Sequence, residues 1–373
     1  MDGVTDAPFR YITAKHGRPD VIFTEFVNVQ SAFFSPQTLL KDFAHTEIER
    51  PLVAQIYGKT PEQFYRVAHI VCELGFDGLD INMGCPAKNV AASGCGAALI
   101  RTPELARDII RAAKQGVRDW YSGQTLLDLE LRGDLITGVS DANRQRTGYA
   151  APRQRRLIPI SVKTRLGYDR VIIEDWLRTL LGEELAAISL HGRTLQQGYR
   201  GDADWQSIAR AVEVAKGSGT LILGNGDVKS LSDAHRRMRQ TQVDGVLIGR
   251  GTQGDPWFFR EKERVKAALR SQCDPVLDGT WVTLGERFRI ILEHCEDFER
   301  FAGRSRFAAM RKHLTWYCRN FRGAAEMRAK MIRANSSADV RLCLQEYLES
   351  LPNLTSPSSF SNCDFVSLSQ CSA

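Results

Sequence analysis

Two cysteines, Cys85 and Cys95, lie ten residues apart in the glycine-rich stretch "GCPAKNVAASGCG". Zinc and iron–sulfur loops usually place their ligands about two to four residues apart, and the chain has no CxxC or HxxxH pair to complete such a set. The spacing therefore argues against a metal site. It leaves open a redox pair, or a loop in which one thiol does chemistry. A thiol with a pKa of about 8.5 is mostly protonated at neutral pH and can act as an acid.

A second group of residues predicts a phosphate site. The segments "LILGNGDV" and "VLIGRG" carry Asn225, Gly226 and Asp227, and Gly249 with Arg250. Backbone N–H groups near glycine can approach a phosphate closely, and the arginine adds positive charge. The alternative is that these glycines only permit tight turns. No GxGxxG pattern is present here, so a dinucleotide-binding fold is not supported.

Two further polar side chains, Lys163 and His191, lie in otherwise apolar segments. A histidine in such a place is more often a core residue whose ring has its hydrogen bonds satisfied. Here both side chains are expected near the predicted phosphate site. A lysine at that position suits an electron-rich ring whose reduced form is negatively charged, as a flavin's is.

A regular alternation of strands and helices positions these residues, up to about residue 255. We predict strands at 20–27, 51–58, 78–85, 158–167, 186–194, 220–228 and 244–251. Continuous apolar strands separated by helical patterns indicate a buried parallel sheet. Polar or glycine residues end all seven strands, whereas a doubly wound sheet would gather them at one switch point. We therefore predict an α/β fold, a (β/α)₈ TIM barrel.

The first strand of this barrel is not accounted for by the sequence. The chain opens "MDGVTDAPFR", which is typical of a turn and a helix start. We therefore expect a barrel that lacks its first strand, with lower stability or weaker cofactor binding.

We place the catalytic domain at 1–259. Within it, 119–157 is an insertion in which "LLDLELRGDLITGV" resembles a hairpin followed by a polar loop, on the face opposite the active site.

A smaller all-helical domain is predicted at 260–350, followed by a Ser-rich tail at 351–373 that is expected to be disordered. Between Arg300 and Arg333 there are ten Lys or Arg residues and one acidic residue, with aromatic residues among them. The whole chain has a net charge of only +6, so its positive charge is concentrated here. A solvated helix face is one explanation, but so one-sided a block favours a polyanion-binding surface.

The bulk composition, 43% hydrophobic and 25% charged, is ordinary for a soluble globular protein. No apolar run reaches the roughly 18 residues that a membrane span needs, and the N-terminus has no signal-peptide pattern. Nine cysteines without regular spacing fit reduced thiols better than a disulfide framework. We therefore expect a cytoplasmic protein, a monomer, with no membrane partner.

Eight motifs in order resemble those of the flavin-dependent tRNA-dihydrouridine synthases: "MDGVTDAPFR", "DINMGCPAKNV", "SGCGAALI", "SVKTRLGYD", "ISLHGRT", "ADW", "NGDV" and "GVLIGRG". The resemblance covers 1–118 and 157–260 closely, and 261–345 by helical character and basic charge. It implies an FMN-containing barrel and a helical domain that helps to hold tRNA. It also implies NADPH as the reductant, and reduction of the C5–C6 double bond of particular uridines, which must be swung out of the folded tRNA.

The resemblance also implies roles for single residues. Cys85, in "GCP", matches the family's proton donor, and Cys95 is then a bystander. Asn82 and Arg193 are candidate uracil contacts. The residues implied to contact FMN are Met1, Asp2, Gln55, Lys163, His191, Asn225, Gly226, Asp227, Gly249 and Arg250. The chemistry is consistent, because hydride transfer to C6 leaves negative charge at C5 that a thiol can protonate.

Two other functions fit parts of the pattern. An FMN barrel that acts on free pyrimidines would share the flavin chemistry but would have no use for the basic helical block. A tRNA-binding protein with an inactive barrel would fit the unaccounted first strand. Activity on tRNA but not on free uracil excludes the former, and a colourless protein that binds tRNA would indicate the latter.

Overall fold

The computed structural model describes residues 1–279 and 282–350, which form two compact units. The first unit comprises Met1–Thr252 and Pro256–Leu277, and the second comprises Gln253–Asp255 and the described residues from Asp278 onward. The predicted Ser-rich tail at 351–373 lies outside the described residues.

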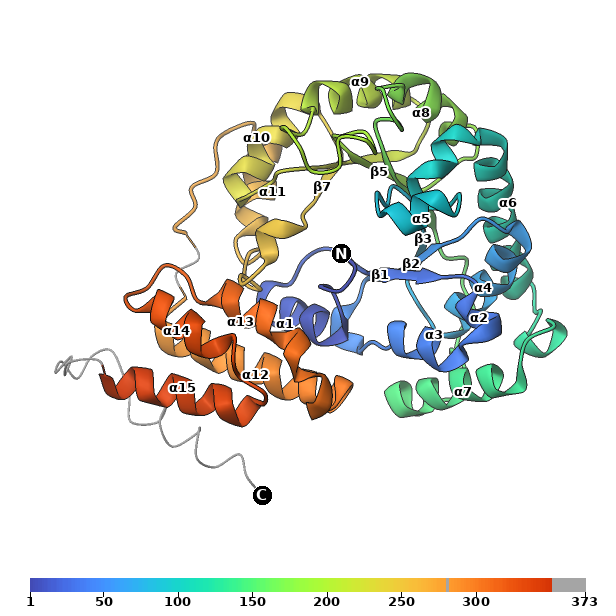
Figure 1. Cartoon of the computed structure of the whole chain (residues 1–373). Coiled ribbons are helices and arrows are strands. Elements are labelled where there is room, and N and C mark those ends of the chain that lie inside the picture. The colour runs from blue at the N-terminus through green and yellow to red at the C-terminus, as the bar shows by residue number, and fades with distance from the viewer. Residues whose placement is uncertain (280–281, 351–373) are drawn as a thin grey trace. The chain divides into compact units, whose positions relative to one another are not determined.

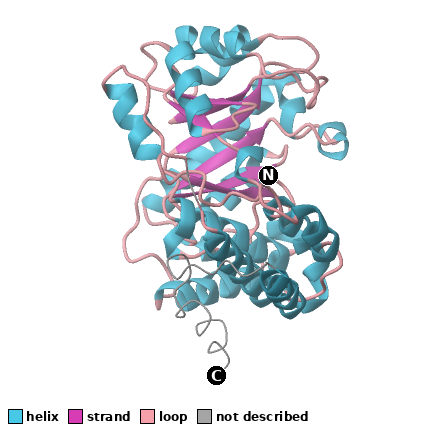
Figure 2. Cartoon of the chain, turned by 90° about the vertical axis from the view of Figure 1, so that its left-hand side faces the viewer, coloured by secondary structure: helices cyan, strands magenta, loops and turns pink. Residues whose placement is uncertain are grey.

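The first unit is built on one sheet of seven strands, as the sequence predicted. The strands are β1 (Ile22–Asn28), β2 (Leu52–Tyr57), β3 (Gly78–Met83), β4 (Ile160–Arg165), β5 (Ala187–His191), β6 (Leu221–Asn225) and β7 (Gly245–Leu247). Each pairs in parallel with the next in chain order, from β1 to β7. Figures 1 and 2 show the strands curving around an interior with helices on their outer side. The arrangement confirms the α/β TIM-barrel class.

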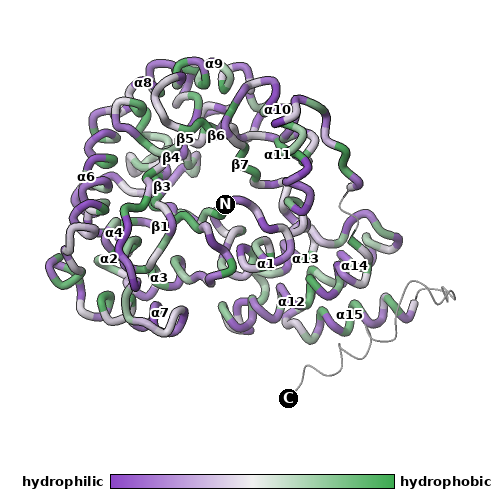
Figure 3. The backbone as a smooth tube through the Cα atoms, turned by 180° about the vertical axis from the view of Figure 1, so that it is seen from behind, coloured by the Kyte–Doolittle hydropathy of each residue, from purple (hydrophilic) through white to green (hydrophobic). Residues whose placement is uncertain are grey.

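Helices connect the strands and cover the outside of the sheet. They are α1 (Ala7–Gly17), α2 (Ser31–Phe34), α3 (Pro36–Asp42), α4 (Pro61–Glu73), α5 (Lys88–Ala92), α6 (Pro103–Tyr121), α7 (Gly133–Thr147), α8 (Ile173–Leu181), α9 (Trp205–Ala215), α10 (Leu231–Thr241) and α11 (Lys262–Arg270). Short 3₁₀ helices lie at Glu47–Glu49, Gly96–Arg101, Leu126–Asp128 and Arg250–Thr252. The helices change between hydrophilic and hydrophobic residues along their length (Figure 3), because one face of each packs on the strands.

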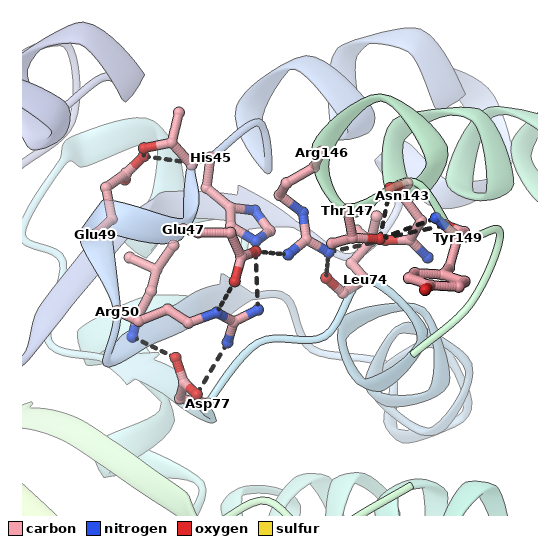
Figure 4. A network of polar contacts seen from close by, with 12 residues as sticks. His45, Glu47, Glu49, Arg50, Leu74, Asp77, Asn143, Arg146, Thr147 and Tyr149 are labelled. Atoms are coloured by element: carbon pink, nitrogen blue, oxygen red, sulfur yellow. Dashed lines mark hydrogen bonds and ion pairs between the residues drawn. The ribbon is translucent and has the colours of Figure 1, made fainter. Parts of the chain in front are cut away.

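The hairpin predicted within the insertion is wrong. Residues 126–139 instead form the 3₁₀ turn and the first half of α7, whose helix continues through the predicted polar loop to Thr147. Leu135, Val139 and Asn143 are buried at a spacing of four residues, the period of a helix rather than a strand. Asn143 Nδ2 donates to the carbonyl of Glu73 at 2.8 Å, and Arg146 Nη2 donates to that of Leu74 at 2.7 Å. Helix α7 is thus tied to the end of α4, and Figure 4 shows the contact with Leu74.

The barrel unit extends beyond residue 259, where the sequence suggested its boundary. Helix α11 belongs to this unit because it packs on α10 and because Lys262 Nζ lies 2.7 Å from Asp20 Oδ1, just before β1. Arg260 Nε also donates to the carbonyl of His16, at the end of α1, at 2.9 Å. These contacts join the last helix of the unit to its first, and the unit ends at Leu277.

The second unit is helical, as predicted. It contains α12 (Leu284–Ala302), a 3₁₀ segment (Arg304–Met310), α13 (Arg311–Tyr317), α14 (Ala324–Met331) and α15 (Ser337–Ser350). Its buried residues include Phe288, Cys295, Phe307, Leu314 and Met331. None of the helices within 1–279 and 282–350 is both long and apolar enough to cross a membrane.

Candidate active site

Polar side chains alternate with core residues along the strands of the first unit. On β3, Asp80 and Asn82 flank Ile81, which is fully buried in the hydrophobic core. On β4, Ser161 and Lys163 flank Val162 in the same way. Successive residues of a strand point to opposite faces of the sheet, so the apolar ones meet the helices and the polar ones line the interior.

The strand register brings these polar residues side by side. Paired positions are Gln55 with Asp80, Asp80 with Ser161, Asn82 with Lys163, Arg165 with His191, and His191 with Asn225. Of the residues predicted from the sequence, six therefore lie together at the C-terminal ends of β2 to β6: Gln55, Asn82, Lys163, His191, Asn225 and, directly after β3, Cys85.

Lys163 is a buried cation whose hydrogen bond goes to a neutral side chain. Its Nζ donates to Asn225 Oδ1 at 3.2 Å, and Asn225 Nδ2 donates to the carbonyl of Leu247 at 2.7 Å. Burial, together with the nearby charge of Arg165, lowers the pKa of Lys163 to about 8. The structure gives Lys163 no ion pair with a carboxylate among the described residues. Such a cation is suited to a ligand that carries or develops negative charge.

Arg165, two residues further along β4, fixes the loop that carries the thiol. Its Nε donates to the carbonyl of Gly84 at 2.7 Å, and its Nη1 donates to the carbonyl of Thr194 at 3.1 Å. Burial lowers the pKa of Arg165 to about 10. The guanidinium therefore joins the residue before Cys85 to the loop after β5, using peptide oxygens only.

Cys85 lies in a small buried cluster with Val90 and Cys95, against Phe26 and Tyr57. It is 8% exposed, and burial raises its pKa above the ordinary thiol value. Both cysteines are free thiols. The thiol of Cys85 is therefore held protonated at neutral pH, in the form that can donate a proton.

Arg193 is enclosed by protein partners. Its Nη2 donates to Asp227 Oδ2 at 2.6 Å and to the carbonyl of Gly201 at 2.5 Å, and its Nε donates to the carbonyl of Arg200 at 3.3 Å. It is only 2% exposed. Arg193 thus ties the loop after β5 to Asp227, beside a hollow of about 360 Å³ lined by Thr194, Gln196, Arg200 and neighbouring residues.

Asp227 also joins the two segments predicted to hold phosphate. Its Oδ1 accepts from Arg250 Nη2 at 2.9 Å, and the arginines at 193 and 250 lower the pKa of Asp227 against the effect of its burial. The Arg250 side chain is 57% exposed and lies over the ring of Tyr199 at 5.3 Å. Gly226 adopts φ +135°, and a Cβ there would lie 2.5 Å from Ala203 Cβ, so the turn requires glycine.

His191 and the first residues of the chain complete the set. Burial, reinforced by nearby cations, lowers the pKa of His191 to about 2, so its ring is neutral. A Cβ on Gly249 would lie 3.2 Å from Met1 Sδ, and Val4 N donates to Glu25 Oε1 on β1 at 2.8 Å. The first residues therefore run between the ends of β7 and β1, and Asp2 is exposed.

Sequence reasoning missed two buried polar residues of this interior, Asp80 and Ser161. Ser161 Oγ donates to Asp80 Oδ1 at 2.6 Å. Burial raises the pKa of Asp80 to about 6, although hydrogen bonds from Ser161 and Gln55 oppose the shift. The sequence did contain a signal for them. Asp80 and Ser161 lie two residues before the predicted Asn82 and Lys163 on the same strands, and therefore on the same face of the sheet. Within 1–279 and 282–350, no three His, Cys, Asp or Glu side chains are grouped so as to hold a metal ion.

The fold and the site define a TIM-barrel protein with a buried thiol and an unneutralised lysine at the carboxyl ends of its strands. The chain belongs to the dihydrouridine synthase (Dus) family, whose model matches residues 1–125 and 149–352. The resemblance seen in its motifs is thus confirmed. The stretch between the two matched parts holds the 3₁₀ turn at Leu126–Asp128 and the whole of α7.

Two curated relatives cover nearly the whole chain. It is 32% identical to "Probable tRNA-dihydrouridine synthase 2" of Bacillus subtilis (strain 168), over 93% of this chain and 92% of the relative. It is 31% identical to "Probable tRNA-dihydrouridine synthase" of Staphylococcus aureus (strain MRSA252), over 93% and 91%. Among solved structures, DHODH from Eimeria tenella in complex with ferulenol matches 64% of each chain with 16% identity and a TM-score of 0.40. A likeness of that extent has no bearing on function.

Proposed function

We propose that this protein is a tRNA-dihydrouridine synthase that reduces the C5–C6 double bond of uridines in tRNA, with FMN as cofactor and NADPH as reductant. Membership of the family and the names of the relatives support the reaction and its substrate class. One observation supports the proposal most. A buried, protonated thiol (Cys85) and a buried lysine without an ion pair to a carboxylate (Lys163) lie at the C-terminal ends of neighbouring strands.

The residues of this interior fit a flavin. Lys163 offers a positive charge to a ring that gains electrons, the amide of Asn225 lies beside it, and Gln55 on β2 adds a further amide. At the rim, Gly249 and the exposed Arg250 suit the phosphate of FMN. Gly226, Asp227, His191, Met1 and Asp2 complete the proposed contacts. Bound FMN would supply the hydride that C6 of the uracil accepts.

Cys85 would then supply the proton. Addition of a hydride at C6 leaves negative charge at C5, and a donor near that atom completes the reduction. Burial keeps the Cys85 thiol protonated, and Arg165 holds the adjacent peptide through the Gly84 carbonyl. Cys95 takes no part. Arg193 would act on uracil indirectly, since its Nε and Nη2 already hold the loop of residues 194–201.

The helical unit would contact the tRNA backbone. Arg304, Arg306, Arg322 and Arg333 are exposed, and within the described residues they form no ion pair with a carboxylate. Exposed cations of this kind bind phosphates and release counterions. A target uridine must leave the tRNA stack to reach the barrel interior, so binding energy from this surface would offset the cost of unstacking.

The proposal is tested with the purified full chain. We expect a yellow protein that forms dihydrouridine in tRNA with NADPH but does not reduce free uracil. Arg250→Ala should release FMN by removing its phosphate anchor, while Arg200→Ala, a matched rim arginine, should retain it. Reduction of free uracil at a comparable rate would favour a pyrimidine reductase, and a colourless protein that still binds tRNA would exclude catalysis by this chain.

A further inference from the structure

We infer that Asp80 is a positioning residue that fixes the backbone carrying Cys85 through the side chains of Gln55 and Asn82. Gln55 Nε2 donates to Asp80 Oδ2 at 2.7 Å, and Asn82 Nδ2 donates to Gln55 Oε1 at 3.0 Å. Asn82 Oδ1 in turn accepts from the backbone N–H groups of Gly84 and Cys85, at 3.0 and 2.9 Å. The inference rests on the proton-donor role proposed for Cys85.

The carboxylate sets the direction of this whole chain of hydrogen bonds. An ionised carboxylate can only accept, so Gln55 must turn its NH₂ group toward Asp80 and its oxygen toward Asn82. Asn82 must then turn its NH₂ group toward Gln55, which leaves its oxygen for the two backbone N–H groups. Reversing either amide would place donor against donor. Asp80 therefore determines the orientation of two side chains and, through them, the turn at Gly84 and Cys85.

Burial excludes a direct role of Asp80 in binding tRNA. Its side chain is fully enclosed, and its other oxygen accepts from Ser161 Oγ at 2.6 Å. Asn82 is similarly engaged, because its oxygen already accepts two backbone hydrogen bonds. Its remaining N–H can still reach a ligand, but its main contribution is to hold the turn at Cys85. Asn82 was expected to bind uracil directly, and this gives it a second role.

Two substitutions of similar size separate this role from mere packing. In Asp80→Asn, the amide oxygen can still accept from Gln55, while its NH₂ group donates to Ser161 Oγ, whose hydroxyl can turn to accept. The direction of the hydrogen bonds is kept. Asp80→Leu fills nearly the same volume but accepts nothing, so the amides of Gln55 and Asn82 become free to turn.

The first readout needs neither cofactor nor tRNA. Alkylation of Cys85 by iodoacetamide is followed in the FMN-free chain by peptide mass spectrometry, with exposed Cys273 as a reagent control and buried Cys72 as a folding control. We expect Asp80→Asn to match the parent within about twofold. Asp80→Leu should raise the rate at Cys85 about tenfold and leave Cys72 protected, because the turn that shields the thiol loosens.

The second readout is kinetic. In the FMN-loaded chain, Asp80→Leu should leave reduction by NADPH within about twofold of the parent. It should slow reoxidation by tRNA about 10- to 100-fold, as expected for an acid displaced by a fraction of an ångström to 1 Å. Equal behaviour of the leucine variant and the parent in both readouts would overturn the inference. An asparagine variant as impaired as the leucine variant would also overturn the inference. That result would show that the charge of the Asp80 carboxylate matters, and not the direction of the hydrogen bonds.

A second variant decides the question if Asp80→Leu exposes Cys72 and is therefore unfolded. In Gln55→Glu, the two carboxyl groups can hydrogen-bond only while they share a proton. Reoxidation by tRNA should then fall by about tenfold, relative to the parent, as the pH rises from 6 to 9. The other groups facing the pair, Lys163 and Ser161 on β4 and the hydroxyl of Thr24 on β1, are common to both proteins. A pH profile identical to that of the parent would contradict the inference. If Cys85→Ala proves fully active, the proposed proton-donor role of Cys85 fails, while the alkylation result still stands.

Discussion

The two ends of the sheet are both rich in charge, but they pair it differently. At the N-terminal ends of β2 and β3, Asp77 accepts from Arg50 Nη1 at 2.9 Å and also pairs with Arg156, and Glu47 pairs with Arg50 and Arg146 (Figure 4). Every cation of this cluster therefore faces a carboxylate. The cluster joins the insertion helix α7 to the segment before β2.

At the C-terminal ends, Lys163 and Arg165 are buried and hydrogen-bond to neutral groups, whereas Arg193 pairs with Asp227. Lys163 donates to an amide oxygen, and Arg165 donates to peptide oxygens. A buried charge without an opposite partner costs free energy, so a fold keeps such groups where a ligand compensates for them. The comparison teaches that the number of charges does not distinguish the functional end of this barrel. The absence of carboxylate partners for Lys163 and Arg165, among the described residues, does.

The largest expected effect concerns the thiol at the functional end. Cys85→Ala should still take up FMN and be reduced by NADPH. Its reoxidation by tRNA should be slower by about 10²–10⁴-fold, the usual range for removal of a general acid. The measurement is stopped-flow flavin absorbance, with the two half-reactions followed separately.

Cys95→Ala is the matched control for this prediction. Its side chain lies in the same buried cluster but outside the turn that Asn82 holds at Cys85, so the variant should lose less than about threefold of the reoxidation rate. Reoxidation of Cys85→Ala at the parent rate would refute the assignment, as would a Cys95→Ala variant that is the slower of the two.

The contrast between the two ends also explains what the sequence could predict. Continuous apolar runs separated by helical patterns indicated the seven strands, and the order of the motifs indicated Cys85 and Lys163. The sequence could not show that Asn82 and Arg193 hydrogen-bond to other protein groups, because their partners Gln55 and Asp227 are distant in the chain. Nor could it distinguish a hairpin from α7, since Leu and Ile at 126–136 satisfy a two-residue as well as a four-residue period.

The second prediction extends the comparison to the helical unit, where some exposed cations are paired and others are not. Reversing Arg306 and Arg333 together, as R306E and R333E, should weaken tRNA binding by about tenfold or more. It should also lower the log–log slope of affinity against salt by roughly 0.9 for each phosphate that the protein no longer neutralises. Binding is measured by fluorescence anisotropy at several salt concentrations.

Paired cations of the same unit provide the control. Arg300 lies 2.6 Å from Asp297, and Lys330 lies 2.6 Å from Glu346, so each is already neutralised. The double variant R300E and K330E should change the slope less than the first pair does. If the salt dependence of tRNA affinity had the same slope in both double variants, the presence or absence of an ion pair would not distinguish the cations that bind tRNA.

The third prediction uses the titration of Lys163. Because its pKa falls from the ordinary 10.5 to about 8 on folding, the unfolded chain binds more protons between these values. The free energy of unfolding of the FMN-free protein should therefore rise with pH from about 8 to 10.5. The affinity for FMN should fall by about tenfold over the same range, as Lys163 loses its positive charge.

If Lys163 is the titrating group, Lys163→Met should remove the pH dependence of both the free energy of unfolding and the FMN affinity. Denaturant titrations of the FMN-free variant should show no rise from this group above pH 8, and its FMN affinity should be lower and flatter. An FMN affinity of the parent that stays constant between pH 7 and 10 would show that Lys163 does not meet the flavin as a cation.

The smallest effect is expected at the N-terminal end of the sheet. Asp77→Ala removes the ion pairs with Arg50 and Arg156 and the hydrogen bond from Leu52 N, at 2.8 Å. Partly exposed ion pairs contribute only about 0–1 kcal/mol to the free energy of unfolding. In this variant Arg50 also keeps its ion pair with Glu47. The variant should lose about 1 kcal/mol of stability by denaturant titration, while both flavin half-reactions stay within about twofold of the parent. If Asp77→Ala instead slowed reoxidation by tRNA more than tenfold at unchanged FMN content, paired charge would also be functional, and the distinction between the two ends would fail.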